Sequence, residues 1–466
     1  MRVSHVAAAT FDDPNLVSCG GLAPVAALSE QCGLGSLLEH HLTVRGTAGA
    51  NAAAKACSVV FGMVAGADSI DDLDLLRHGG MHRLLPDVRA PSTLGTFLRA
   101  FRFGHVRQLD AVAARLLTAL SQRAPLLPGA GETTFIDIDD TVREVHGYAK
   151  QGAGFGYSGV RGLNALLATL STPTSAPVIA AARLRKGSVN SARGARRIVA
   201  DALAVAKTCG AGGTDGSGRV LVRMDSAFFT YDALAPVLTH KACFSVTARM
   251  NPAVTGALSR ITESAWTAIH YPHAVWDDDE QRWISDAEVA EIPFTAFTGR
   301  RKAEHVPGRL VVRRVKRLQP RSAQPGSGQQ SELFTAYRYH ALFTNSTEDT
   351  VTADLTHRAH AIVEQVIADL KNGPLAHLPS GVFNANAAWL TLATIAFNLT
   401  RAAGCLAGSL HARATTGTLR ARLINVPARI ARSARRLALH LPAHWPWQTG
   451  WTALFTATTG PPTTAS

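Results

Sequence analysis

The sequence lacks the cysteine and apolar patterns of several large protein classes. Its six cysteines are scattered with no CxxC pair, which argues against a zinc site or a disulfide framework and favours a reducing cytoplasm. The first thirty residues lack a basic start followed by an apolar run, so no signal peptide is predicted. The most apolar stretch, 385–400, is interrupted by Asn386 and Asn398 and predicts a buried helix rather than a membrane span.

Other familiar site patterns are missing as well. The eighteen histidines include no HExxH spacing, which argues against that class of zinc hydrolase. The glycine-rich stretch 152–159 is not followed by Lys–Ser/Thr, so a nucleotide-phosphate loop is not predicted. Aromatic residues make up only 6 % of the chain, which disfavours the aromatic cleft of a carbohydrate hydrolase.

Acidic residues are scarce relative to basic ones. Lys and Arg number 47 against 34 Asp and Glu, giving a formal net charge of +13 and a pI near 9.9. Residues 401–466 contain eight arginines and no acid, and residues 299–321 contain nine Lys/Arg against one Glu. A third basic cluster lies within residues 183–197. Segregated positive charge is typical of proteins that bind a polyanion such as nucleic acid, although an ordinary basic protein is the alternative.

At 466 residues the chain is long enough for two or three domains. Residues 1–128 read as a helical N-terminal region, in which 71–103 fits a DNA-binding helix–turn–helix or plain helix packing equally well. Residues 129–240 alternate strands with helices, the pattern of an α/β core. Residues 241–345 predict a β-rich insertion. We expect the core to resume over 346–404 and to be followed by a basic helical region over 405–466.

Two predicted strands carry acids at informative places. In "TFIDIDDTV", Asp137 and Asp139 alternate with apolar residues, which puts both on one face of a strand. A second apolar strand, "RVLVRMD", ends at Asp225. Carboxylate oxygens are the ligands that Mg²⁺ prefers, and paired ions held this way catalyse phosphodiester chemistry. An acidic centre inside a basic protein therefore indicates a nucleic-acid phosphotransferase.

A third acid lies in the predicted helix 357–371. Its apolar positions recur at Val363, Val366, Ile367 and Leu370, which is helix spacing. On this helix His357, His360, Glu364 and Lys371 share one narrow stripe. An amphipathic helix with a solvated charged face explains such a stripe, and so does a carboxylate directed into a site between cationic groups.

These motifs together resemble the bacterial insertion-sequence transposases of the DDE, cut-and-paste type. The resemblance rests on "IDIDDTV", "GYSGVRGLNALLA", "VRMDSAFF", the long block from "HAIVEQVIADLK" to "NLTRAAG", and "LINVPARIARSARRLALHLPAHWPW". It covers most of the chain, and the long block is its most specific part. It implies an α/β fold with a ribonuclease-H-like catalytic core, interrupted by the β-rich insertion between the second Asp and the Glu.

Carried over by position, the resemblance makes Asp225 and Glu364 the second and third catalytic and metal-binding acids. Asp139 fits the first, with Asp137 as the alternative. Related transposases carry Tyr, Arg, Glu and Lys at the spacing of 357, 360, 364 and 371. Lys371 matches, whereas the two histidines depart from the pattern, and neutral His binds phosphate more weakly than Arg.

The implied activity is binding of the element's terminal inverted repeats, metal-dependent DNA strand cleavage and strand transfer to target DNA. Mg²⁺ is the expected cofactor, and Mn²⁺ can substitute. The resemblance further implies a homodimer on paired DNA ends, a bacterial cytoplasmic, nucleoid-associated location and no membrane partner. The alternative is a catalytically inactive, transposase-derived DNA-binding protein. Expected DNA contacts are Lys371, His360, His357, Arg223, Arg313, Arg314, Arg432, Arg435 and Arg436.

Overall fold

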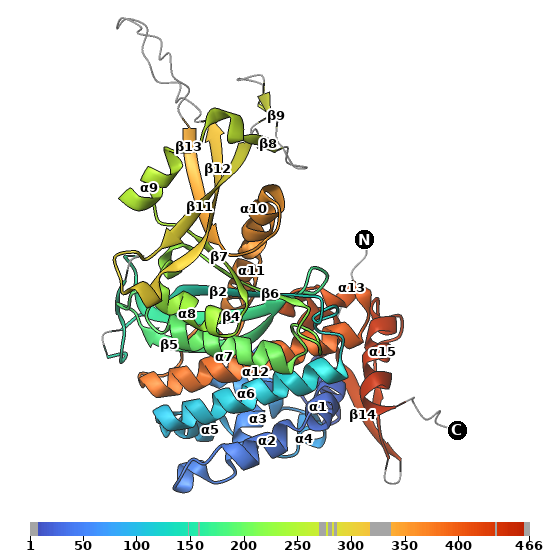
Figure 1. Ribbon diagram of the computed structural model, residues 1–466. Helices are drawn as coiled ribbons and strands as arrows, with labels where there is room; N and C mark the ends of the chain where they lie inside the picture. Colours follow the sequence, from blue (N-terminus) through green and yellow to red (C-terminus); the bar gives the residue numbers. More distant parts are fainter. Residues whose placement is uncertain are drawn as a thin grey trace, which may run out of the picture.

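The computed structural model is layered, with a central β-sheet over stacked helices and a β-rich extension on the opposite side of the sheet (Figure 1). It describes residues 8–147, 149–156, 159–269, 276–277, 282–283, 287–316, 337–433 and 436–460. The strands and helices alternate as expected for an α/β protein. The boundaries of the five predicted segments stay a prediction.

The N-terminal region is mostly helical. Its α-helices are α1 (Leu22–Gln31), α2 (Leu34–His41), α3 (Ala52–Ala65), α4 (Met81–Leu84), α5 (Pro91–Arg99) and α6 (Phe103–Arg123), with a 3₁₀ segment η2 (Asp71–Leu76). α5 begins at Pro91, where a missing N–H costs nothing. α3, α5 and α6 pack against the long helix α12 (Phe383–Leu406). The N-terminal helices therefore share one hydrophobic core with the rest of the chain.

The central part of the sheet has the strand order β5-β4-β2-β6-β7, with the short strand β3 (Gly154–Phe155) also paired to β4. Its strands are β2 (Thr133–Glu144), β4 (Arg161–Ser171), β5 (Val178–Lys186), β6 (Arg219–Met224) and β7 (Cys243–Thr247). β4 is antiparallel to both of its neighbours, β2 and β5, whereas β6 and β7 run parallel to β2. The helices α7 (Ala195–Thr208) and α8 (Tyr231–Thr239) make the crossovers to β6 and β7.

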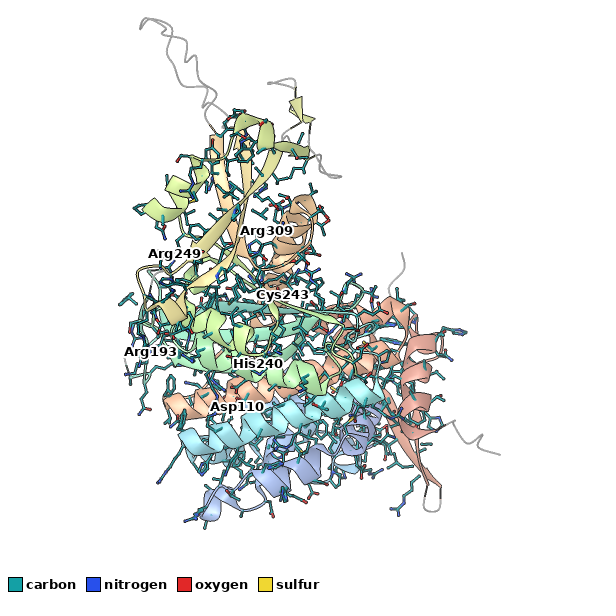
Figure 2. All side chains as sticks on the ribbon, in the orientation of Figure 1. Asp110, Arg193, His240, Cys243, Arg249 and Arg309 are labelled. Carbon is teal, nitrogen blue, oxygen red and sulfur yellow. The ribbon has the colours of Figure 1, made fainter. Side chains whose placement is uncertain are left out.

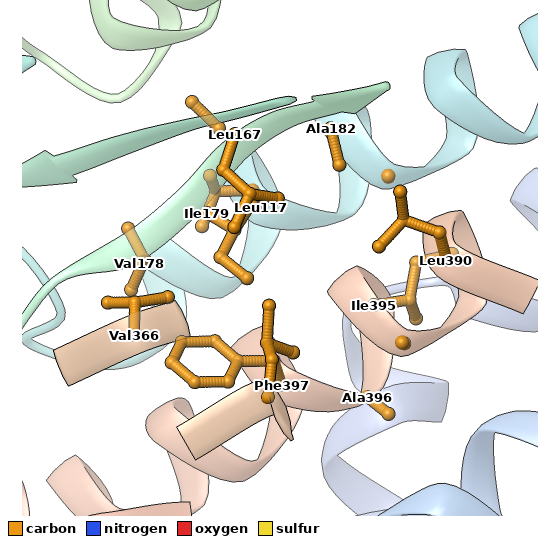
Figure 3. Close-up of a cluster of buried hydrophobic side chains, with 14 of the residues drawn as sticks. Leu117, Leu167, Val178, Ile179, Ala182, Val366, Leu390, Ile395, Ala396 and Phe397 are labelled. Carbon is orange, nitrogen blue, oxygen red and sulfur yellow. The ribbon is translucent and has the colours of Figure 1, made fainter. Parts of the chain in front are cut away.

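α12 forms the centre of the core, as the apolar stretch 385–400 predicts. Every residue from Ala385 to Gly404 is buried. Leu390, Ile395 and Phe397 of this helix lie close to side chains of β4 and β5 in Figure 3. Asn398 holds the helix to the sheet, since its amide donates to the Ile179 carbonyl and accepts from the Ile179 N–H, each at 2.8 Å. Among the described helices, none is long and apolar enough to cross a lipid bilayer.

The strands predicted in the β-rich segment form an antiparallel extension of the same sheet. They are β8 (Thr267–Ile269), β11 (Ala287–Ala296), β12 (Val306–Lys316) and β13 (Tyr337–Thr344), with a separate pair β9 (Trp276–Asp277) and β10 (Arg282–Trp283) and the helix α9 (Pro252–Leu258). β13 pairs antiparallel with β7, so the extension continues the central sheet directly. It projects away from the helical layers in Figure 1.

The predicted helix 357–371 is broken in the structure. α10 (Thr350–Arg358) ends in a 3₁₀ turn, η6 (Ala359–Ala361), before α11 (Ile362–Lys371) begins. The buried face of α11 is Val363, Val366, Ile367 and Leu370, which confirms the predicted apolar face. The single helical stripe that joined the two histidines to Glu364 and Lys371 was wrong, because His357 belongs to α10 and His360 lies in the 3₁₀ turn between the two helices.

The C-terminal region is not simply helical, which corrects the sequence prediction. It contains α13 (Ser409–Ala412), α14 (Thr416–Leu419), a π-helical turn (Arg420–Ile424), the strands β14 (Ala428–Ser433) and β15 (Arg436–His440), and α15 (Gln448–Thr459). β14 pairs with the N-terminal strand β1 (Leu16–Val17) in a small three-stranded sheet. The sequence prediction followed the many arginines of this region and overlooked the alternation of apolar and basic residues around Ile430, which suits a strand.

Candidate active site

The register of two parallel strands brings two of the predicted acids together. β2 and β6 align Asp137 with Arg223 and Ile138 with Met224, so the next pair along the strands is Asp139 and Asp225. Both acids line a cavity of about 570 Å³, together with Ser188, Asn190 and Arg249. β6 ends at Met224, and Asp225 caps the turn Ser226–Phe228 by accepting a 3.0 Å hydrogen bond from Ala227 N.

Burial and mutual repulsion make these two carboxylates costly to ionise. Burial, followed by the negative charges of Asp225 and Asp140, raises the pKa of Asp139 to about 6. Burial also raises the pKa of Asp225, and the charge of Asp140 adds to that rise. Two close acids with raised pKa values are typical of a site that accepts a cation or a proton. Hard oxygen ligands in this arrangement suit a divalent ion such as Mg²⁺.

The other two aspartates of β2 are already neutralised by arginine. Asp137 is fully buried and accepts hydrogen bonds of 2.7 and 2.8 Å from Nε and Nη2 of Arg223. Asp140 also lines the cavity, but it pairs with Arg185, while Asn164 donates a 2.8 Å hydrogen bond to it. Of the three carboxylates, Asp139 is therefore the one left without a cationic hydrogen-bond partner in the described structure.

The burial of Arg223 corrects the expectation that this residue contacts DNA. Its side chain is only 2 % exposed, and its Nη1 donates a 2.8 Å hydrogen bond to the Thr356 carbonyl. The guanidinium also lies 4.2 Å from the ring centroid of Phe135. Every polar group of Arg223 is directed into the core, where it holds Asp137 and the end of α10 in place.

The two histidines that were expected to contact DNA, His357 and His360, have separate environments. His357 has its ring nitrogens 2.7 Å from Ser245 Oγ and 2.9 Å from Thr247 Oγ1, and burial lowers its pKa to about 3. A neutral ring with both nitrogens engaged offers no charge to phosphate, which corrects the expected DNA contact. His360 is 14 % exposed and places Nδ1 3.0 Å from Asp137 Oδ1. When the ring is protonated, it opposes the rise in the pKa of both Asp139 and Asp225.

The structure does not bring Glu364 into the same group as the two aspartates. Glu364 is exposed in the first turn of α11, and the described residues contain no cluster of three or more His, Cys, Asp or Glu side chains poised to hold one ion. Lys371, at the other end of α11, lies near Asp139 and Arg143. Burial and then the charge of Arg143 lower its pKa, while Asp139 opposes that fall.

The expected DNA contacts of the extension are mostly paired within the protein. Arg314 is 5 % exposed and makes ion pairs of 2.7 Å with both Glu263 and Glu288, which corrects its assignment to a DNA surface. Arg313 is 21 % exposed and lies 3.7 Å from Asp354. Arg309, labelled in Figure 2, likewise pairs with Glu291.

The three predicted DNA contacts of the C-terminal hairpin are not tested by the structure. Arg432 is exposed on β14. Arg436 begins β15, and its side chain, like the whole of Arg435, lies outside the described residues. These three stay predictions.

Sequence reasoning missed two cations near the acids. Arg143 follows Asp139 by four residues on β2, so strand alternation puts it on the same face, and this signal was available in the sequence. Arg249 comes from the loop after β7 and donates hydrogen bonds of 2.8 and 2.9 Å to the carbonyls of Ser226 and Ala227. It lies where the extension joins the sheet (Figure 2) and steadies the turn after Asp225, a contact that no local pattern announces.

The comparison with known proteins identifies the family of the chain. No curated protein matches the sequence. The family described as transposase DDE domain group 1 matches residues 3–459, nearly the whole chain. A conserved domain of this extent includes both strands that carry Asp139 and Asp225, as well as the helix of Glu364. The chain therefore belongs to the DDE transposase family.

Proposed function

We propose that the protein is an active DNA transposase that binds the terminal inverted repeats of its own element, cleaves DNA strands there and transfers them to target DNA. The observation that carries the proposal is the parallel β2–β6 register, in which Asp139 and Asp225 are neighbours facing one cavity. The excess of basic residues supports a polyanionic substrate.

We assign the central strands to a ribonuclease-H-like core. The support for this assignment is the order β5-β4-β2-β6-β7, with three antiparallel strands followed by two strands parallel to β2. The first acid lies within the central strand β2, and the second follows the neighbouring parallel strand. The extension then enters after β7, between the second acid and Glu364.

Asp139 and Asp225 would hold a divalent cation, Mg²⁺ or Mn²⁺, with Glu364 as a further ligand. Their raised pKa values fit such a role, because a dication relieves the repulsion between two partly buried carboxylates. When bound, the cation supplies Lewis acidity that activates the attacking hydroxyl and stabilises the leaving oxygen. Asp137 is not favoured as the first acid, because Arg223 and His360 already occupy its oxygens.

The remaining groups around the acids bind and orient DNA in this proposal. Lys371 provides positive charge beside Asp139 and contacts a backbone phosphate. Arg249 fixes the turn that carries Asp225. Asp137 holds the ring of His360, which lowers the pKa of Asp139 when the ring is protonated. Two copies of the chain would act on paired DNA ends, within the bacterial cytoplasm at the nucleoid.

The decisive experiment is strand cleavage by the purified protein on DNA carrying the element's own ends, with Mg²⁺ or Mn²⁺. We expect the wild type to cut at the repeat boundary, and Asp225→Asn and Glu364→Gln to bind the same DNA without cutting it. Asp232→Asn, an exposed acid whose side chain is 59 % exposed, is the matched control and should cut normally. A wild-type protein that binds these ends and never cuts would instead be an inactive, transposase-derived DNA-binding protein.

A further inference from the structure

A second cleft lies beyond the acids along β2. It has a volume of about 760 Å³, and its walls come from η2, α5, the end of β2, the loop after β2 and the segment 376–379. Arg99 of α5, Arg143 of β2 and Lys150 supply its fixed positive charge, and we call this site the basic cleft. Arg143 follows Asp139 by four residues, so the cleft begins about 13 Å along the strand from the acids at 3.3 Å per residue.

The arginines of the basic cleft have no acidic partner in the described structure, unlike three arginines of the central sheet. Arg183, Arg185 and Arg219 are ion-paired with Asp110, Asp140 and Glu348 respectively. Within the described residues no carboxylate pairs with Arg99 or Arg143. Arg99 donates a 3.1 Å hydrogen bond to Thr96 Oγ1 and has no other hydrogen-bond partner among the described residues.

Arg143 gives a second, independent sign that an anion is required. Its Nε is shielded from solvent and has no hydrogen-bond partner among the described residues. Its charge also acts on the ammonium of Lys371 and lowers the pKa of that lysine, after burial. Two like charges and an unused donor at one place are unfavourable unless an anion binds between them.

Two acids also line the basic cleft, Asp71 and Glu144, and neither pairs with its cations in the described part of the chain. Glu144 follows Arg143 directly on β2, and its side chain is exposed at the cleft. Each carboxylate weakens the attraction for a polyanion without cancelling any one cation. Substitutions of the neighbouring residues Arg143 and Glu144 should therefore change DNA affinity in opposite directions.

We propose that the basic cleft binds the phosphate backbone of the DNA strand whose reacting phosphate lies at Asp139 and Asp225. Arg143 and Arg99 contact successive phosphates, and Arg143 together with Lys371 continues the path from the cleft to the acids. The N-terminal helical region would then bind DNA through Arg99, in the same chain that carries the acids. This inference rests on the proposed function for the identity of the DNA.

The test measures how DNA affinity depends on salt, using a fluorescein-labelled duplex that carries one end of the element. Each lost phosphate contact lowers the slope of log K against log salt by about 0.9. We expect Arg99→Gln and Arg143→Gln each to lower the salt slope by about 0.9. Arg143→Lys keeps the positive charge and should keep the wild-type slope. Glu144→Gln removes a negative charge and should bind DNA more tightly. Arg45→Gln, an exposed arginine outside the cleft, is the matched control.

The inference is overturned if Arg99→Gln and Arg143→Gln keep the slope of the Arg45→Gln control. The Lys variant protects against a folding artefact, because a structural defect at Arg143 would not be repaired by restoring charge alone. Cleavage by the wild type is read separately. If the wild type cuts DNA but the Arg99→Gln and Arg143→Gln variants keep the wild-type salt slope, the basic-cleft proposal is rejected and the proposed function stands. If the slopes change but the wild type never cuts, the proposed function is rejected and the cleft is still a DNA contact.

Discussion

Asp137 and Arg223 face each other across the β2–β6 pair, two residues before Asp139 on β2 and Asp225 just past the end of β6. The first couple is a buried ion pair with two hydrogen bonds, of 2.7 and 2.8 Å. The second couple consists of two acids with no cation between them in the described structure. Because Arg223 neutralises Asp137, the uncompensated negative charge along these two strands lies at Asp139 and Asp225, where a metal ion is proposed to bind.

Arg223→Met should destabilise the fold strongly. It leaves Asp137 as an uncompensated buried charge, which costs about 3–5 kcal/mol of unfolding free energy. Removing both charges in Asp137→Leu/Arg223→Met should recover much of that loss. Arg196→Ala, which breaks an exposed pair with Asp232, should cost less than about 1 kcal/mol. Urea unfolding checks the series, and equal losses for Arg223→Met and Arg196→Ala would contradict the buried pair.

Asp139→Asn should stabilise the metal-free protein near neutral pH. Since the pKa of Asp139 is raised from 3.8 to about 6, the folded state binds more protons than the unfolded state between these values. Unfolding free energy therefore falls as pH rises through that window. The variant cannot ionise at this position, so its unfolding free energy near neutral pH should exceed that of the wild type by about 1–3 kcal/mol. Its amide oxygen still accepts the hydrogen bond from Asp140 N.

Thermal unfolding in EDTA as a function of pH measures this effect. The advantage of Asp139→Asn should be full near pH 7.5 and vanish below pH 4, where the wild-type carboxyl is protonated in both states. Asp232→Asn serves as the exposed control and should show no such profile. A variant that is no more stable than wild type at neutral pH would show that ionisation of Asp139 is not costly.

Mg²⁺ should raise the melting temperature of the wild type in a pH-dependent way. Binding requires ionised carboxylates, so the stabilisation should shrink as pH falls through about 6. At Mg²⁺ concentrations far above its Kd we expect about 1–3 kcal/mol. Differential scanning fluorimetry should detect no Mg²⁺ response in Asp139→Asn or Asp225→Asn. A full response in either variant would place the ion elsewhere.

Arg314→Ala should loosen the β-rich extension without changing the salt dependence of DNA binding. The guanidinium lies between Trp266 and Tyr337, at 4.3 and 4.4 Å from their ring centroids, and pairs with two glutamates. Faster hydrogen exchange in β11–β13 would report the loss. Arg432→Gln, at an exposed position predicted to contact DNA, should lower the slope by about 0.9. A similar fall for Arg314→Ala would contradict its internal role.

Much of the chain could be predicted because its signals are local. The spacing of Val363 and Leu370 predicted the buried face of α11, and the apolar stretch around Trp389 predicted the central helix α12. Strand alternation and the acid at the end of a strand pointed to Asp137, Asp139 and Asp225, and only the resemblance to DDE transposases favoured Asp139 over Asp137 as the first acid. The broken helix at Ala359–Ala361 and the hairpin β14–β15 were missed, because tertiary packing overrode a helical pattern in both places.

The sequence by itself determined the chain's positive charge, its α/β alternation and the identity of its candidate acids, since each follows from composition or from a period of two or 3.6 residues. Only the tertiary structure decided which charges are free. Arg223 and Arg314 look like DNA contacts in the sequence yet are neutralised by Asp137, Glu263 and Glu288, whereas Arg143 has no acidic partner in the part of the chain that the structure describes. An ion pair depends on distance in space, and strands and loops far apart along the chain set that distance.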